Sequence, residues 1–163
     1  MTGSYRTLVR DDLPDRGIPP ELADTLEAKL ALALGPAIRW HLWLFFVPPE
    51  GAKPGEGGMS MPCDDLPRTP PPDAFDVLTR VIGSVAPAIG STEIILALER
   101  RGSPEPGRLD RAWMRLVTTA ADAVGVTVRS VLISHTRGVR GHNAPTVDAA
   151  LTLPAAPQGG DDC

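Results

Sequence analysis

The chain has 163 residues and a formal net charge of −4 at pH 7. A chain of this length buries roughly 70% of its unfolded surface as one domain, so disulfides are not needed for stability. No segment approaches the ~18 consecutive apolar residues of a membrane span, and charges stand where a signal peptide needs an apolar stretch. The acidic balance argues against nucleic acid and anionic lipid as partners. We therefore expect a soluble, cytoplasmic protein with no membrane association.

The first part of the chain predicts a helix followed by two strands. Leucines recur every fourth residue in the segment 19–36, which indicates a helix with one apolar face. The run IRWHLWLFFV, residues 38–47, is apolar on both alternating faces, a pattern typical of a central strand covered on both sides. Residues 48–58 are rich in Pro and Gly and predict a connection. A short strand around 58–63 is expected to return antiparallel to the first.

The second part predicts two helices that alternate with strands. One helix follows the prolines at 70–72, and Pro87 is expected to end or kink it. The run 92–98 predicts a buried strand and 126–135 another strand of branched residues. The helix between them closes at Gly125 and should turn inward the residues Leu109, Trp113, Leu116, Ala120 and Val124.

These elements predict a single α/β domain over residues 1–153, with helices on both faces of a small mixed sheet. A final strand near 146–153 completes this expectation, and residues 154–163 are expected to form a disordered tail.

The segment EIILALERRGSPEPGRLDRAW, residues 93–113, runs from a strand through a Gly/Pro loop into a helix. Loops at strand ends often carry catalytic residues. Asp110 stands in the first turn of the helix, where the helix dipole and free N–H groups favour an acid by ~0.3–1 kcal/mol. Glu99 at the strand end is interpreted as a solvated charge. A weak Mg²⁺ or Mn²⁺ site made by Glu99 and Asp110 is the alternative.

The segment from about 70 to 136 resembles the RadC-like branch of the JAB/MPN (JAMM) metalloprotease superfamily. The resemblance rests on IILA, then GSPEP, then LDR, a helix, and the strand VRSVLIS. The zinc signature of that family is His-x-His, seven residues, Ser, two residues and Asp. Counted back from Asp110, it falls on Gly107, Glu99 and Ala97, or on Leu98 at the first position with a one-residue gap.

Neither alignment supplies an imidazole, so the resemblance implies a degenerate member without the His-x-His zinc ligands. We therefore expect a non-catalytic JAB/MPN-like pseudoenzyme, a protein-interaction or scaffold module with no cofactor and no metal. The resemblance also implies a protein partner or a homo-oligomer.

Other candidate residues lie outside this loop. His41 stands in an apolar strand and is expected to be a core or edge histidine. His135 and His142 flank TRGVRG and could approach each other across a turn. The alternative function is therefore a hydrolase with an unrecognised or residual metal site, at Glu99/Asp110 or at His135/His142.

Two groups of basic residues remain as candidate binding surfaces. A glycine-containing loop directly after the strand 126–135 carries Arg137, Arg140 and His142, and Arg129 lies nearby. These four residues predict a binding site for an acidic or anionic partner. A basic stripe is expected on the exposed side of the third helix, at Arg108, Arg111 and Arg115. No nucleophile elbow or phosphate-binding glycine motif occurs in the sequence.

Overall fold

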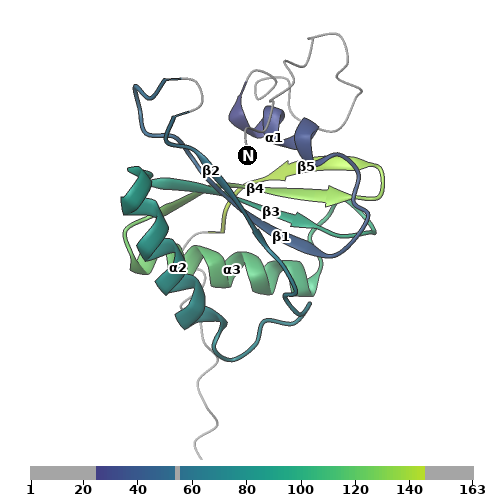
Figure 1. Cartoon of the computed structure of the whole chain (residues 1–163). Helices are drawn as coiled ribbons and strands as arrows, with labels where there is room; N and C mark the ends of the chain where they lie inside the picture. The colour runs from purple at the N-terminus through teal and green to yellow at the C-terminus, as the bar shows by residue number, and fades with distance from the viewer. Residues whose placement is uncertain (1–24, 54–55, 146–163) are drawn as a thin grey trace, which may run out of the picture.

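The structure is a computed structural model that describes residues 25–53 and 56–145. These residues form a five-stranded mixed sheet with three helices, which confirms the predicted fold class (Figure 1). The start of the first predicted helix, the expected strand near 146–153 and the tail 154–163 lie outside the described residues. None of the helices in the described ranges is long and apolar enough to cross a membrane.

The strands lie in the order β2-β1-β3-β4-β5. β1, His41–Phe46, pairs antiparallel with β2, Met59–Cys63, and with β3, Glu93–Glu99, so it is central as predicted. β3 pairs parallel with β4, Thr127–His135, and β4 pairs antiparallel with β5, Gly138–His142.

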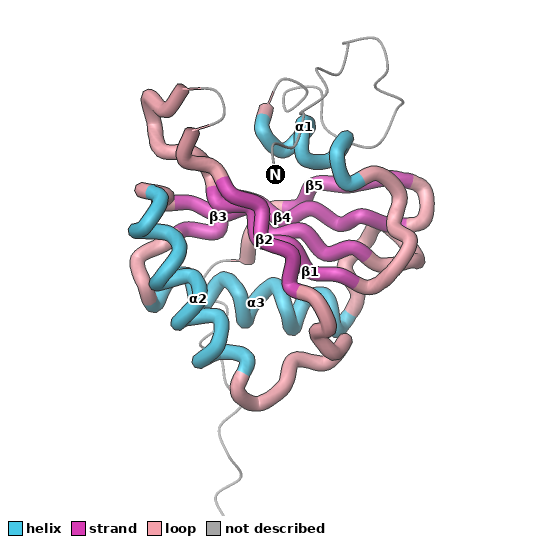
Figure 2. The backbone as a smooth tube through the Cα atoms, viewed as in Figure 1, coloured by secondary structure: helices cyan, strands magenta, loops and turns pink. Residues whose placement is uncertain are grey.

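Helices cover both faces of this sheet (Figure 2). α2, Ala74–Ile89, and α3, Arg108–Ala123, lie together on one face, where they enclose the larger apolar core with Leu42, Leu96 and other strand residues. α1, Leu26–Leu34, packs on the opposite face through Ala31. α3 connects the parallel strands β3 and β4, because a crossover between parallel strands needs a connection long enough to span the sheet.

α2 continues past Pro87, where the sequence predicts an end or a kink. The missing N–H of proline removes a single bond to the carbonyl four residues earlier. Only Ala88 and Ile89 follow before Gly90 ends the helix with a φ of 70°, so little helix depends on the lost bond. Ala86 is fully buried beside the proline and holds this last turn against the core.

The buried face of α3 is centred slightly differently from the predicted one. Trp113 and Ala120 are fully buried, as expected. Leu109, Leu116 and Val124 are only partly buried. The other buried positions of the helix are Asp110, Met114, Val117, Thr118 and Ala121. Leu116 therefore lies at the border of the helix–sheet contact and remains partly accessible from outside.

Residues 138–142, expected to belong to a loop, form the edge strand β5. The hairpin turns at Thr136 and Arg137 and pairs His135 with Gly138. The sequence GVRGH gives a weak strand signal because it contains two glycines and one branched residue. Val139 is fully buried in the α1-side core, and this contact together with the ladder to β4 holds the strand.

Candidate functional site

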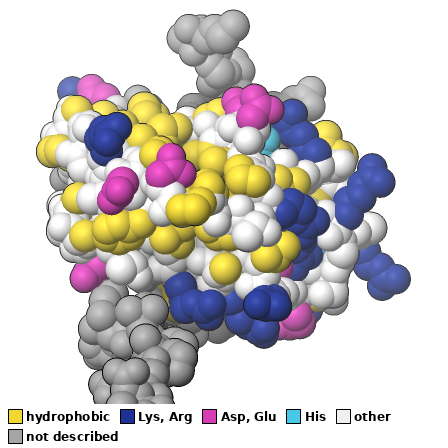
Figure 3. All heavy atoms as spheres, turned by 90° about the horizontal axis from the view of Figure 1, so that it is seen from below, with side chains coloured by type: hydrophobic (Ala, Val, Ile, Leu, Met, Phe, Trp, Pro, Cys, Tyr) yellow, Lys and Arg dark blue, Asp and Glu magenta, His cyan; other side chains and the backbone are white. Residues whose placement is uncertain are grey.

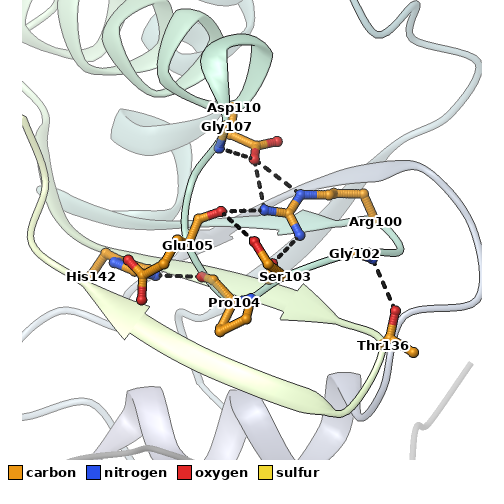
Figure 4. Close-up of polar contacts among 9 residues, drawn as sticks. All are labelled: Arg100, Gly102, Ser103, Pro104, Glu105, Gly107, Asp110, Thr136 and His142. Atoms are coloured by element: carbon orange, nitrogen blue, oxygen red, sulfur yellow. Dashed lines mark hydrogen bonds and ion pairs between the residues drawn. The ribbon is translucent and has the colours of Figure 1, made fainter.

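The segment 100–107 connects the end of β3 to the start of α3. It lies at the carboxyl ends of the parallel strands β3 and β4, the edge at which α/β sheets usually bind ligands. The hairpin of β4 and β5 lies beside it (Figure 4). We call this segment the β3–α3 loop.

Arg100 forms the centre of the loop, and its side chain is only 6% exposed. Its Nε and Nη2 donate to Oδ2 of Asp110 at 3.0 and 2.8 Å. Nη2 also donates to the carbonyl of Glu105 at 2.8 Å, and Nη1 donates to the carbonyl of Ser103. Figure 4 shows the guanidinium between Asp110 and these carbonyls. One side chain therefore ties the loop to the first turn of α3.

Asp110 has a second role at the start of α3, where the sequence places it. Its Oδ2 accepts from the backbone N–H of Gly107 at 2.7 Å and so caps the helix. Its Oδ1 is buried and has no hydrogen-bond partner among the described residues. Burial favours the neutral acid, but the hydrogen bonds from Arg100 and Gly107 outweigh it, and the pKa of Asp110 lies below its ordinary value.

The β4–β5 hairpin holds the outer side of the loop through side chains. Three contacts through hairpin side chains join the two segments: His142 Nε2 donates to the Pro104 carbonyl at 3.0 Å, Arg140 pairs with Glu105, and Gly102 N–H donates to Thr136 Oγ1 at 2.9 Å. The loop is thus fixed from inside by Arg100 and from outside by the hairpin. Such a loop presents a defined surface and has little freedom to close over a substrate.

The four predicted binding residues are not brought together. Arg140 and His142 lie against the β3–α3 loop, and Arg137 is exposed at the hairpin turn. Arg129 lies near the opposite end of β4, where it pairs with the buried Glu27 of α1 at 2.8 Å. Arg129 therefore joins α1 to the sheet.

The two histidines of the alternative metal site are also kept apart. In the hairpin His135 lies opposite Gly138, whereas His142 lies opposite Val131. Four strand positions separate the two, a distance of about 13 Å along the strand. Burial, together with the charges of Arg140, Arg100 and Arg137, lowers the pKa of His135.

Glu99 is buried, so its interpretation as a solvated charge is wrong. Its carboxylate accepts from the N–H of Ile38 at 3.3 Å and from the indole of Trp43 at 3.4 Å. Trp43 and Ala97 belong to the core on the α1 side, whereas Asp110 belongs to α3 on the other face. Glu99 and Asp110 therefore do not face each other.

A row of buried polar side chains crosses the α1 side of the sheet. His41, Glu99 and Ser134 lie directly opposite one another on β1, β3 and β4. Ser134 Oγ donates to the carbonyl of Gly35 at 2.7 Å, and Nε2 of His41 lies 3.2 Å from Oδ1 of Asp64. Glu99 and Ser134 thus hold the segment 35–38 over the sheet.

The sequence alone does not place these three residues in one row. The available signal is a polar residue at one end of each apolar run, namely His41, Glu99 and Ser134, but only the strand register shows that the three are aligned. His41 is buried, in agreement with its interpretation as a core or edge histidine.

The residues that the resemblance places at the zinc ligands do not fit a zinc ion. Ala97 and Glu99 lie on the α1 side, whereas Gly107 and Asp110 lie at the start of α3. The alternative first position, Leu98, packs in the core beneath α2 and α3. Within residues 25–53 and 56–145, no group of three His, Cys, Asp or Glu residues could hold a metal ion.

Cys63 is a poor candidate nucleophile. Burial, with a contribution from the charge of Asp64, raises the pKa of its thiol to about 11. A thiol with this pKa is protonated at neutral pH, and the thiolate is the reactive form.

No protein family, curated protein or solved structure matches this chain.

Proposed function

We propose that this domain is a non-catalytic protein-interaction or scaffold module, a degenerate JAB/MPN-like domain that has lost its metal site and in which Asp110 belongs to an internal ion pair. The observation that carries the proposal is the pairing of Arg100 with Asp110. Asp110 is the one acid that the resemblance retains at a ligand position, and the guanidinium binds its Oδ2 through two nitrogens.

A metal ion at Asp110 would have to compete with this guanidinium. Both side chains are almost fully buried, so solvent screens the repulsion between two cations there only weakly. Displacing Arg100 would leave its charge buried without a partner and would free the carbonyls of Ser103 and Glu105. The ion pair therefore favours a metal-free loop.

The fixed loop also supports an interaction role over a catalytic one. Its shape depends on contacts from β3, α3 and the β4–β5 hairpin, so its exposed residues are held in place before any partner binds. A preorganised surface loses little conformational entropy on binding, which is an advantage for a docking module.

Elemental analysis of the full chain, purified without chelators, tests this proposal. We expect no stoichiometric metal in the wild type, and no change in melting temperature when Zn²⁺ or Mn²⁺ is added. One bound metal per chain that is lost in Asp110→Ala, but retained in the matched helix variant Asp122→Ala, would overturn the proposal. If Asp110→Ala does not fold, the wild type alone decides the test, because a rise in its melting temperature on addition of Zn²⁺ or Mn²⁺ would contradict the proposal.

A further inference from the structure

The outward face of α3 carries a row of exposed arginines. Arg108, Arg111 and Arg115 follow one side of the helix at positions i, i+3 and i+7, as the sequence predicts. Their guanidinium groups form no ion pair or hydrogen bond with any other described residue. This concentration of positive charge contrasts with the net charge of −4 of the chain.

A shallow, open hollow lies beside these arginines. It is lined by Pro70, Phe75, Ala112, Arg115, Leu116 and Thr119. Phe75 and Leu116 are partly buried and form its apolar floor between the start of α2 and the middle of α3. Figure 3 shows apolar side chains spread over this lower face, with both basic and acidic side chains around them.

We propose that this α3 surface, defined by the three arginines and the hollow, binds an acidic amphipathic segment of a partner protein. Apolar side chains of the segment occupy the hollow over Phe75 and Leu116. Its carboxylates pair with Arg111 and Arg115, since a guanidinium binds a carboxylate through two parallel hydrogen bonds. Binding of an amphipathic segment through its apolar face is a common mode of peptide recognition.

The charges around the hollow give the bound segment an orientation. The border formed by α3 is basic, whereas the start of α2 carries two exposed acids, Asp73 at the N-cap and Asp76 in the first turn. The acidic edge of the segment therefore lies along α3 and away from α2. This proposal rests on the proposed function and specifies the partner of the interaction module.

Two other occupants fit the surface less well. A second copy related by a two-fold axis would place this arginine row against the same row of its partner, which is repulsive. A nucleic acid would use the arginines but would leave the apolar hollow without an apolar occupant. An acidic amphipathic segment uses both features.

The test measures binding of a fluorescent synthetic peptide with leucines at helical spacing and flanking glutamates. A matched peptide carries lysines in place of the glutamates. For the full-length chain we expect the glutamate peptide to bind at least about tenfold more tightly, with an advantage that falls as salt rises. The double variant Arg111→Glu/Arg115→Glu should reverse this preference, and Leu116→Asp should weaken binding of the glutamate peptide.

Lys29→Glu is the matched control, because this exposed residue lies on α1 at the opposite face of the sheet. It should leave the preference unchanged. Equal binding of both peptides, or an unchanged preference in the double variant, would overturn the proposal. So would tighter binding of single-stranded DNA that the double variant loses, or self-association that Leu116→Asp abolishes. Any of these results in a metal-free chain refutes this surface alone, whereas stoichiometric metal that is lost in Asp110→Ala refutes the proposed function.

Discussion

Glu99 and Arg100 are neighbours in the chain, yet their side chains leave the end of β3 on opposite faces of the sheet. Glu99 accepts hydrogen bonds from Ile38 and Trp43 on the α1 side. Arg100 donates to Asp110 at the start of α3. This follows from the alternation of side chains along a strand. The carboxylate of Glu99 and the guanidinium of Arg100 are therefore buried in two separate places, although the two residues are adjacent in the sequence.

Asp110→Asn should destabilise the fold strongly. The neutral amide leaves the buried guanidinium of Arg100 without its counter-charge, and breaking such a pair costs about 3–5 kcal/mol. Urea denaturation followed by circular dichroism measures the change in the free energy of unfolding. The exposed Asp122→Asn on the same helix should change it by less than about 0.5 kcal/mol. A similar small effect at Asp110 would contradict a structural role for the pair.

The contribution of Asp110 should depend on pH with a defined sign. Its folded-state pKa lies below the ordinary value of 3.8, so the unfolded chain binds a proton first as the pH falls. The stabilisation is therefore complete above the unfolded pKa and is lost as the pH falls through the folded value. We expect the free-energy difference between wild type and Asp110→Asn to be constant above about pH 5 and to shrink below pH 4. A difference that grows on acidification would contradict this assignment.

The sequence predicts the framework of this loop better than its interior. The position of Asp110 in the first helical turn follows from local helix chemistry, which a short segment contains. Arg100 and Arg101 look alike in the sequence, but Arg100 is buried and Arg101 is exposed. Which of the two turns inward depends on the pleat of β3 and on the position of α3, and both are set by contacts distant in the chain.

The same limit applies to the edges of the sheet. β1 and β3 are predicted because their apolar runs are continuous, and such runs have few alternatives in a folded domain. β5 is missed because an edge strand pairs on one side only and needs little apolar surface of its own. Its place is determined by the ladder to β4 and by the burial of Val139.

Arg100→Lys should loosen the β3–α3 loop and leave the sheet intact. A lysine keeps the positive charge but cannot reproduce the forked donors that reach Asp110 and the carbonyls of Ser103 and Glu105. Amide hydrogen exchange should become at least about tenfold faster within residues 101–107, while exchange in β3 changes little. The exposed Arg101→Lys serves as the matched control. Unchanged exchange in this loop would show that the guanidinium does not determine its conformation.

His135 should make the fold less stable in mildly acidic solution. Burial and the charges of Arg140, Arg100 and Arg137 hold its pKa below the ordinary value of 6.5, so the unfolded chain binds the proton first. The free energy of unfolding should therefore fall as the pH drops from about 6.5 toward the folded-state pKa. Urea denaturation of the wild type and of His135→Gln from pH 5 to 8 measures the size of this fall, as the difference in pH dependence between their free energies of unfolding. An NMR titration gives the folded-state pKa of the imidazole directly, and a midpoint at or above 6.5 would contradict the prediction.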